Sequence, residues 1–119
     1  MQCVLIAQRA GAFSRSLAEA LSEHFEVHIC ARGDTALKLL GSLRPDILIL
    51  DLMLPCLDGL TVLKAATYIP PRVLALTPML DAGVLQAACD AGISELLALP
   101  CTVDAVLARL KMRSPSPGR

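Results

Sequence analysis

Short apolar runs alternate along the chain with longer segments in which apolar residues recur every three or four positions. The short runs cover residues 3–7, 25–30, 46–50, 72–76 and 93–98, and several are nearly continuous in Val, Ile and Leu. Runs of this length and composition are typical of strands that are buried on both faces of a parallel sheet. The pattern therefore predicts five buried strands at these ranges.

The segments between the runs have the spacing of amphipathic helices. Their inward-facing residues fall within 13–21, 36–40, 60–66, 84–88 and 103–110. Asp34, Asp81 and Thr102 are placed to cap the second, fourth and fifth helices, and Gly41 is placed to help end the second. Strands and helices that alternate through short connections favour parallel strands, right-handed crossovers and helices on both faces of the sheet.

Composition and charge narrow the class of protein. A chain of 119 residues with 55% hydrophobic and 18% charged residues is long enough for one packed domain and is too apolar for disorder. The charges of eleven basic and eleven acidic residues cancel, so the chain lacks the net positive charge that is typical of proteins that bind nucleic acids or anionic membranes. With no signal-peptide pattern and no apolar stretch near ~18 residues, we expect a soluble, cytoplasmic protein without a membrane segment.

The sequence carries little sign of catalytic or structural-metal chemistry. The five cysteines are an odd number, with no CxxC pair and no histidine at metal spacing, so neither a disulfide framework nor a zinc site is predicted. Glycine-rich nucleotide motifs and a nucleophile elbow are absent too, so we expect no enzyme.

Polar residues gather where the predicted strands end, which is the functional edge of an open parallel sheet. Asp51 follows the third apolar run, and Thr77 follows the fourth. A hydroxyl at Thr77 could reach an oxyanion near Asp51, although each residue could instead cap a turn. Pro55, Asp58 and Gly59 shape the loop that comes after Asp51.

The stretch from Pro45 to Leu60 strongly resembles the centre of receiver domains of two-component response regulators. Residues 75–77 resemble the end of the family's fourth strand, and residues 92–100 resemble its fifth strand with the following proline, Pro100, whose peptide bond we expect to be cis. The resemblance implies a receiver domain at 1–112 with a flavodoxin-like α/β fold: a five-stranded parallel sheet of order 2-1-3-4-5 with helices on both faces. Residues 113–119 then form a disordered tail or the start of an interdomain linker. Within the family, the Asp58-Gly59 loop is most similar to regulators of the sporulation-initiation type.

The resemblance also implies a chemistry. In the family, a histidine kinase passes a phosphoryl group to the aspartate that matches Asp51. A Mg²⁺ ion supports the transfer, held by this carboxylate, by an acidic pair after the first strand and by the backbone carbonyl that matches Met53. A lysine before the strand-five proline and the hydroxyl that matches Thr77 contact the phosphoryl oxygens.

This sequence departs from the family at the positions that carry charge. The acidic pair falls on Gln8 and Arg9, and the lysine position is Leu99. Mg²⁺ prefers anionic oxygen ligands, and a unit charge about 4 Å away is worth about 4 kcal/mol at an effective dielectric near 20. We therefore predict no metal and no cofactor at this site, with Arg9 paired to Asp51 where the metal would stand; the alternative is an Arg9 side chain that points to solvent.

Two functions follow from these departures. The first is an atypical receiver, a pseudo-receiver, that acts through protein contacts without Mg²⁺-dependent phosphorylation. The alternative is a phosphoaccepting receiver that is still phosphorylated on Asp51 in a phosphorelay and that requires Mg²⁺.

The family signals through the face formed by its fourth helix, fifth strand and fifth helix. We expect protein partners on this face, among them a second copy of the chain and a histidine kinase, and no direct nucleic-acid binding by this domain. An exposed apolar face favours association, while the alternative is that the same residues pack as core. The residues expected on this face are Val84, Leu85, Ala88, Leu97, Ala105, Val106 and Arg109.

Overall fold

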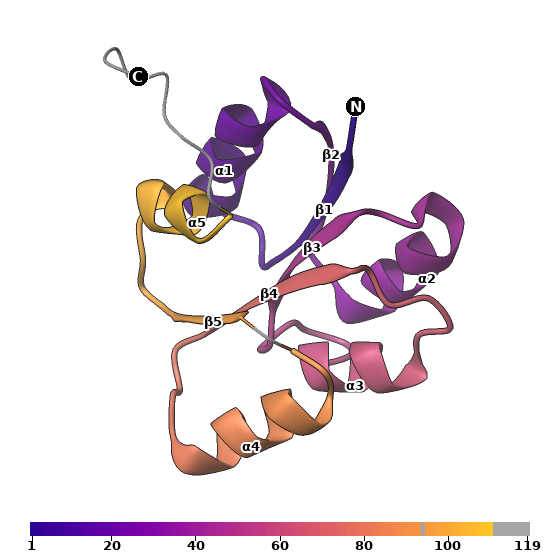
Figure 1. The fold of residues 1–119 in the computed structure, drawn as a ribbon, viewed down its shortest axis with the longest axis vertical. Coiled ribbons are helices and arrows are strands. Elements are labelled where there is room, and N and C mark those ends of the chain that lie inside the picture. The colour runs from indigo at the N-terminus through magenta and orange to yellow at the C-terminus, as the bar shows by residue number, and fades with distance from the viewer. Residues whose placement is uncertain (94, 111–119) are drawn as a thin grey trace.

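The structure, a computed structural model, describes residues 1–93 and 95–110. Its centre is a five-stranded sheet of order β2-β1-β3-β4-β5, and every neighbouring pair of strands is parallel. The predicted sheet order is confirmed (Figure 1). The predicted domain boundary at 112 and the predicted tail at 113–119 lie outside the described residues. The strands are β1 (Cys3–Ala7), β2 (Glu26–Cys30), β3 (Ile47–Asp51), β4 (Arg72–Thr77) and β5 (Glu95–Ala98).

Five helices in the described part of the chain cover the two faces of the sheet. They are α1 (Ala12–Ser22), α2 (Gly33–Leu43), α3 (Gly59–Ala65), α4 (Ala82–Asp90) and α5 (Val103–Arg109). Helices α1 and α5 lie together on one face, and α2, α3 and α4 lie on the other (Figure 1). None of these helices is long and apolar enough to cross a bilayer.

The core has two halves because successive strand side chains point to opposite faces. On β1, Leu5 belongs to the half beneath α2 and α3, whereas Val4 and Ile6 belong to the half beneath α1 and α5. Strand β3 lies in the middle of the sheet, and all five of its residues are buried. Each fully buried Leu or Ile contributes roughly 1.5–3 kcal/mol, so the continuous apolar runs both predict the strands and stabilise them.

Two of the three predicted helix caps are confirmed. The Asp81 side chain accepts a hydrogen bond from the Val84 N–H at 2.8 Å, and the Thr102 side chain accepts one from the Ala105 N–H at 3.1 Å. Each bond satisfies an N–H group that has no partner within its own helix.

The predictions for both ends of α2 were wrong. Gly33 starts this helix, so Asp34 lies in its first turn and binds the Arg32 guanidinium through two hydrogen bonds of 2.9 and 3.0 Å. These bonds lower the pKa of Asp34 to about 2. Gly41 is an exposed residue inside the helix, which continues to Leu43. The helix ends where Arg44 adopts a left-handed conformation with φ of 46°.

Candidate functional site

The carboxyl ends of β1, β3 and β4 bring the predicted site residues to one edge of the sheet. Asp51 is the last residue of β3, and Thr77 is the last residue of β4. Gln8 and Arg9 directly follow β1, which pairs with β3. Asp51 and Thr77 are fully buried, so their polar groups depend on protein partners.

Both oxygens of the Asp51 carboxylate have partners. Oδ1 accepts a hydrogen bond from the Met53 N–H at 2.9 Å. Asp51 therefore also caps the turn after β3, the alternative role considered from the sequence. Oδ2 accepts one from Arg9 Nε at 3.3 Å, so the predicted pairing of Arg9 with Asp51 is present. The Arg9 side chain remains 55% exposed while it compensates the buried carboxylate.

The donors at this edge do not fit a Mg²⁺ site. Mg²⁺ requires several hard oxygen ligands in octahedral geometry and binds mainly through carboxylates. Here Asp51 offers a single carboxylate, and the Arg9 guanidinium already contacts one of its oxygens. Gln8 Oε1 is a neutral oxygen that is buried without a hydrogen-bond partner among the described residues. A cation next to this carboxylate opposes the entry of a divalent ion.

The Thr77 side chain caps the turn after β4, which was one of its two predicted roles; the other was a contact with a phosphoryl group. Its Oγ1 accepts a hydrogen bond from the Met79 N–H at 3.1 Å. Thr77 and Met53 also line a groove of about 420 Å³ that extends to Leu60 of α3 and Val84 of α4. Thr77 therefore lies at the base of a groove between α3 and α4, with its hydroxyl engaged in the turn to Met79.

Asp58 and Gly59 fix the start of α3 close to Asp51. Asp58 Oδ1 accepts a hydrogen bond from the Thr61 N–H at 2.9 Å and caps the helix. The Gly59 N–H donates to the Leu52 carbonyl at 3.1 Å. A Cβ at Gly59 would lie 2.9 Å from both the Asp51 carbonyl oxygen and Leu52 Cα, so this position requires glycine.

Pro55 joins the same loop to α2. Its carbonyl accepts a hydrogen bond from the Gly33 N–H at 3.0 Å. A Cβ at Gly33 would overlap the Leu57 carbonyl, so the loop and the helix start are in direct backbone contact. Cys56, between Pro55 and Leu57 in the loop, has a left-handed conformation with φ of 71°.

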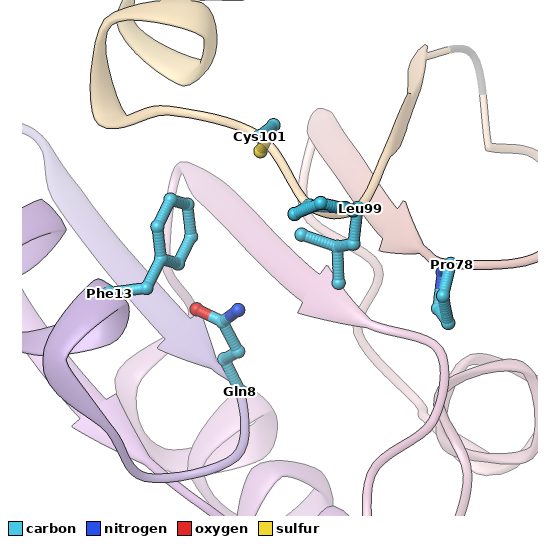
Figure 2. Close-up of a pocket in the computed structure, with 6 residues that line it drawn as sticks. Gln8, Phe13, Pro78, Leu99 and Cys101 are labelled. Carbon is cyan, nitrogen blue, oxygen red and sulfur yellow. The ribbon is translucent and has the colours of Figure 1, made fainter.

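Leu99, which the resemblance matches to a lysine of the family, lines a hollow next to Gln8. The peptide bond between Leu99 and Pro100 is cis, as predicted, and the Leu99 N–H donates to the Thr77 carbonyl at 2.8 Å. In Figure 2 the side chains of Leu99, Phe13 and Gln8 border the same space. The hollow has a volume of about 290 Å³, and an alkyl chain there supplies no charge for a phosphoryl group.

The predicted contact face is partly exposed and partly core. Leu85 of α4 is 50% exposed, and Arg109 of α5 is exposed. Ala88 and Val106, which the sequence placed on this face, are buried, so that assignment was wrong. They lie on the helix sides that pack against the sheet, in opposite halves of the core.

Solved structures with the same fold include receiver domains and a chemotaxis protein. The chemotaxis protein CheY4 of Vibrio cholerae is 24% identical and has a TM-score of 0.84, with 93% of this chain and 97% of that chain covered. A response regulator receiver domain protein of Methanospirillum hungatei also has a TM-score of 0.84, at 21% identity, with 93% and 91% covered. These likenesses confirm the flavodoxin-like fold.

Sequence relatives identify the family more directly. The response regulator MprA of Mycolicibacterium vanbaalenii is 33% identical over 111 residues, which cover 91% of this chain and 48% of the relative. MprA of a Mycobacterium species is 33% identical over 119 residues, with 96% and 52% covered. The chain therefore spans about half the length of these relatives, and the narrower likeness to sporulation-initiation regulators stays a prediction. The family model for the response regulator receiver domain matches residues 4–111, and this chain belongs to that family of two-component signalling modules.

Proposed function

We propose that this receiver is a pseudo-receiver, a non-catalytic cytoplasmic module that signals through protein contacts without Mg²⁺-dependent phosphorylation of Asp51. The observation that carries the proposal is the contact of Arg9 Nε with Asp51 Oδ2 at 3.3 Å. The contact puts a protein cation against the carboxylate that a metal ion would need.

The charges at the site support this proposal. Asp51 and Arg9 together carry no net charge, whereas a family site with an acidic pair presents three carboxylates. Phosphoryl transfer depends on positioning and on neutralising the charge of the transferred group. Leu99 leaves that charge without the lysine that the family provides.

Magnesium titration and acetyl phosphate labelling test the proposal together. We expect calorimetry to find no site that saturates at cellular magnesium concentrations, and we expect acetyl phosphate to leave the protein unlabelled. Saturation in that range, with labelling that disappears in Asp51→Asn, would instead establish the phosphoaccepting alternative. Asp58→Asn, which changes a carboxylate outside the buried pair, is the matched control for the labelling.

The partners of this module are proposed to bind the face formed by α4, β5 and α5. Leu85 exposes apolar surface on α4, and Met79 and Leu80 expose more in the loop that leads into α4; such surface favours association. We propose that a second copy of the chain or a histidine kinase binds this face. Direct nucleic-acid binding is disfavoured by the balanced charge.

Sedimentation over a range of concentrations tests the homodimer. We expect the apparent mass to rise with concentration and to return to that of the monomer in Leu85→Arg. Gln86→Arg, an exposed change of the adjacent residue, is the control. A mass that stays at the monomer value at every concentration would exclude the homodimer.

A further inference from the structure

Three metal-binding side chains meet at the end of the sheet opposite Asp51. Cys3 and Glu26 are the first residues of β1 and β2, and the strand register places them side by side. His28 lies two positions after Glu26, so it projects from the same face of β2. One ligand atom from each of the three residues lies within 4.8 Å of the other two.

We propose that Cys3, Glu26 and His28 form a binding site for a divalent cation of the zinc class, with solvent completing the coordination. A thiolate, an imidazole and a carboxylate are the three ligand types that Zn²⁺ takes from proteins. Mg²⁺ and Ca²⁺ prefer oxygen ligands, so the sulfur and nitrogen donors favour zinc or a similar transition metal.

A tetrahedral ion requires only a small change in the spacing of the three ligand atoms. Bonds of about 2.0–2.3 Å at tetrahedral angles separate ligand atoms by roughly 3.3–3.8 Å. His28 Nε2 lies 2.7 Å from Glu26 Oε2 in the structure, so these two atoms need to separate slightly to admit an ion. Their side chains are 35% and 59% exposed, which leaves them free to rotate by that amount.

The charges at the cluster also favour a divalent cation. A thiolate at Cys3 and the Glu26 carboxylate together carry two negative charges, which balance the charge of the ion. Asp46 lies beside them, because its Oδ2 accepts a hydrogen bond from the Cys3 N–H at 2.7 Å.

The ion has a route to this cluster. Strand β2 is an edge strand of the sheet, with β1 as its neighbour on one side only. The exposed Glu26 side chain opens the cluster to solvent at this edge. An ion held here would join β1 to β2 and stabilise the edge of the sheet.

Cobalt titration of the reduced protein tests the site. We expect one equivalent of Co²⁺ to produce a thiolate-to-cobalt charge-transfer band, and Zn²⁺ to displace it. Cys3→Ser abolishes the band, because serine provides no thiolate. Glu26→Gln and His28→Gln each remove a direct ligand and should weaken Co²⁺ binding by at least about 10-fold, since loss of a group that only supports a ligand already costs about 10- to 100-fold.

Matched variants separate this site from other thiols and histidines. Cys89→Ser and His24→Gln change exposed residues of the same kinds and should leave the affinity for Co²⁺ unchanged. Asp51→Asn should also leave it unchanged, so the result is independent of the proposed function. Zn²⁺ should raise the melting temperature of the unmodified protein but not that of Cys3→Ser, whose circular dichroism reports whether it folds. Absence of a saturable band, or a band that persists in folded Cys3→Ser, would overturn the proposal.

Discussion

Stepwise replacement of Arg9 measures how strongly its charge keeps Mg²⁺ from Asp51. Arg9→Gln removes one positive charge, Arg9→Asp changes the local charge by two units, and Gln8→Asp with Arg9→Asp changes it by three. A unit charge about 4 Å from the ion is worth about 1 kcal/mol in water and about 4 kcal/mol at an effective dielectric near 20. The Arg9 side chain is more than half exposed, so solvent screens its charge and we use the value for water.

These charges translate into a graded gain in affinity. Since 1.4 kcal/mol corresponds to a factor of ten, the three variants should bind Mg²⁺ about 5-fold, about 30-fold and about 150-fold more tightly than the unmodified protein. Isothermal titration calorimetry measures the affinities. Lys38→Glu changes the net charge by the same two units as Arg9→Asp on the exposed surface of α2 and should give less than a 2-fold change.

One result would refute this reasoning. If Arg9→Asp bound Mg²⁺ no more tightly than Lys38→Glu, the guanidinium would not be the barrier to the ion. The geometry of the loop after Asp51 would then be the limiting factor, and the contact at 3.3 Å would have no bearing on metal binding.

Three further predictions concern stability. Gly59→Ala should lower the free energy of unfolding, measured in urea titrations, by about 1–3 kcal/mol, because its Cβ would meet backbone atoms at 2.9 Å. Gly41→Ala, a control with open space around the new Cβ, should raise the free energy of unfolding by about 0.5–1 kcal/mol, and equal effects of the two variants would contradict the prediction. Asp58→Ala should cost about 1 kcal/mol through loss of the α3 cap, measured in the same way, and no loss would show that the cap is dispensable. The hydrogen bonds from Arg32 lower the pKa of Asp34 to about 2, so they stabilise the fold fully above pH ~4 and cease to do so as the pH falls through 2. The difference in unfolding free energy between the unmodified protein and Asp34→Asn should therefore vanish over that range. A difference that persisted at lower pH would refute the assignment.

The strands could be predicted because residues that are buried on both faces of the sheet form continuous apolar runs in the sequence. Strand β3 is buried on both faces, and its run Ile47–Leu50 is wholly apolar. The caps at Asp81 and Thr102 are equally local, since each side chain bonds an N–H three residues along the chain. Local signals of this kind need no knowledge of the fold.

Contacts between distant segments could not be predicted in the same way. The cluster of Cys3, Glu26 and His28 depends on the register of β1 with β2, and its residues show no metal-ligand spacing along the sequence. A signal was present in the alternation of Glu26 and His28, which places both on one face of a strand.

The sequence also could not reveal how deeply some side chains are buried. Gln8 follows a strand, where polar residues are usually exposed, yet it is buried beside Phe13 and Leu99. On α4 and α5, Ala88 and Val106 turned out to face the sheet, because the direction of a short helix face depends on how the helix docks.

The backbone contact between Gly33 and the loop after Asp51 limits how this receiver can move. No side chain separates Gly33 from Leu57, and the Pro55 carbonyl accepts a hydrogen bond from the Gly33 N–H. The loop therefore cannot shift without moving the first turn of α2. A partner that pulls on this loop would therefore displace the covering of β1 and β2, far from α4. Such a movement would carry a change at this loop to that side of the sheet.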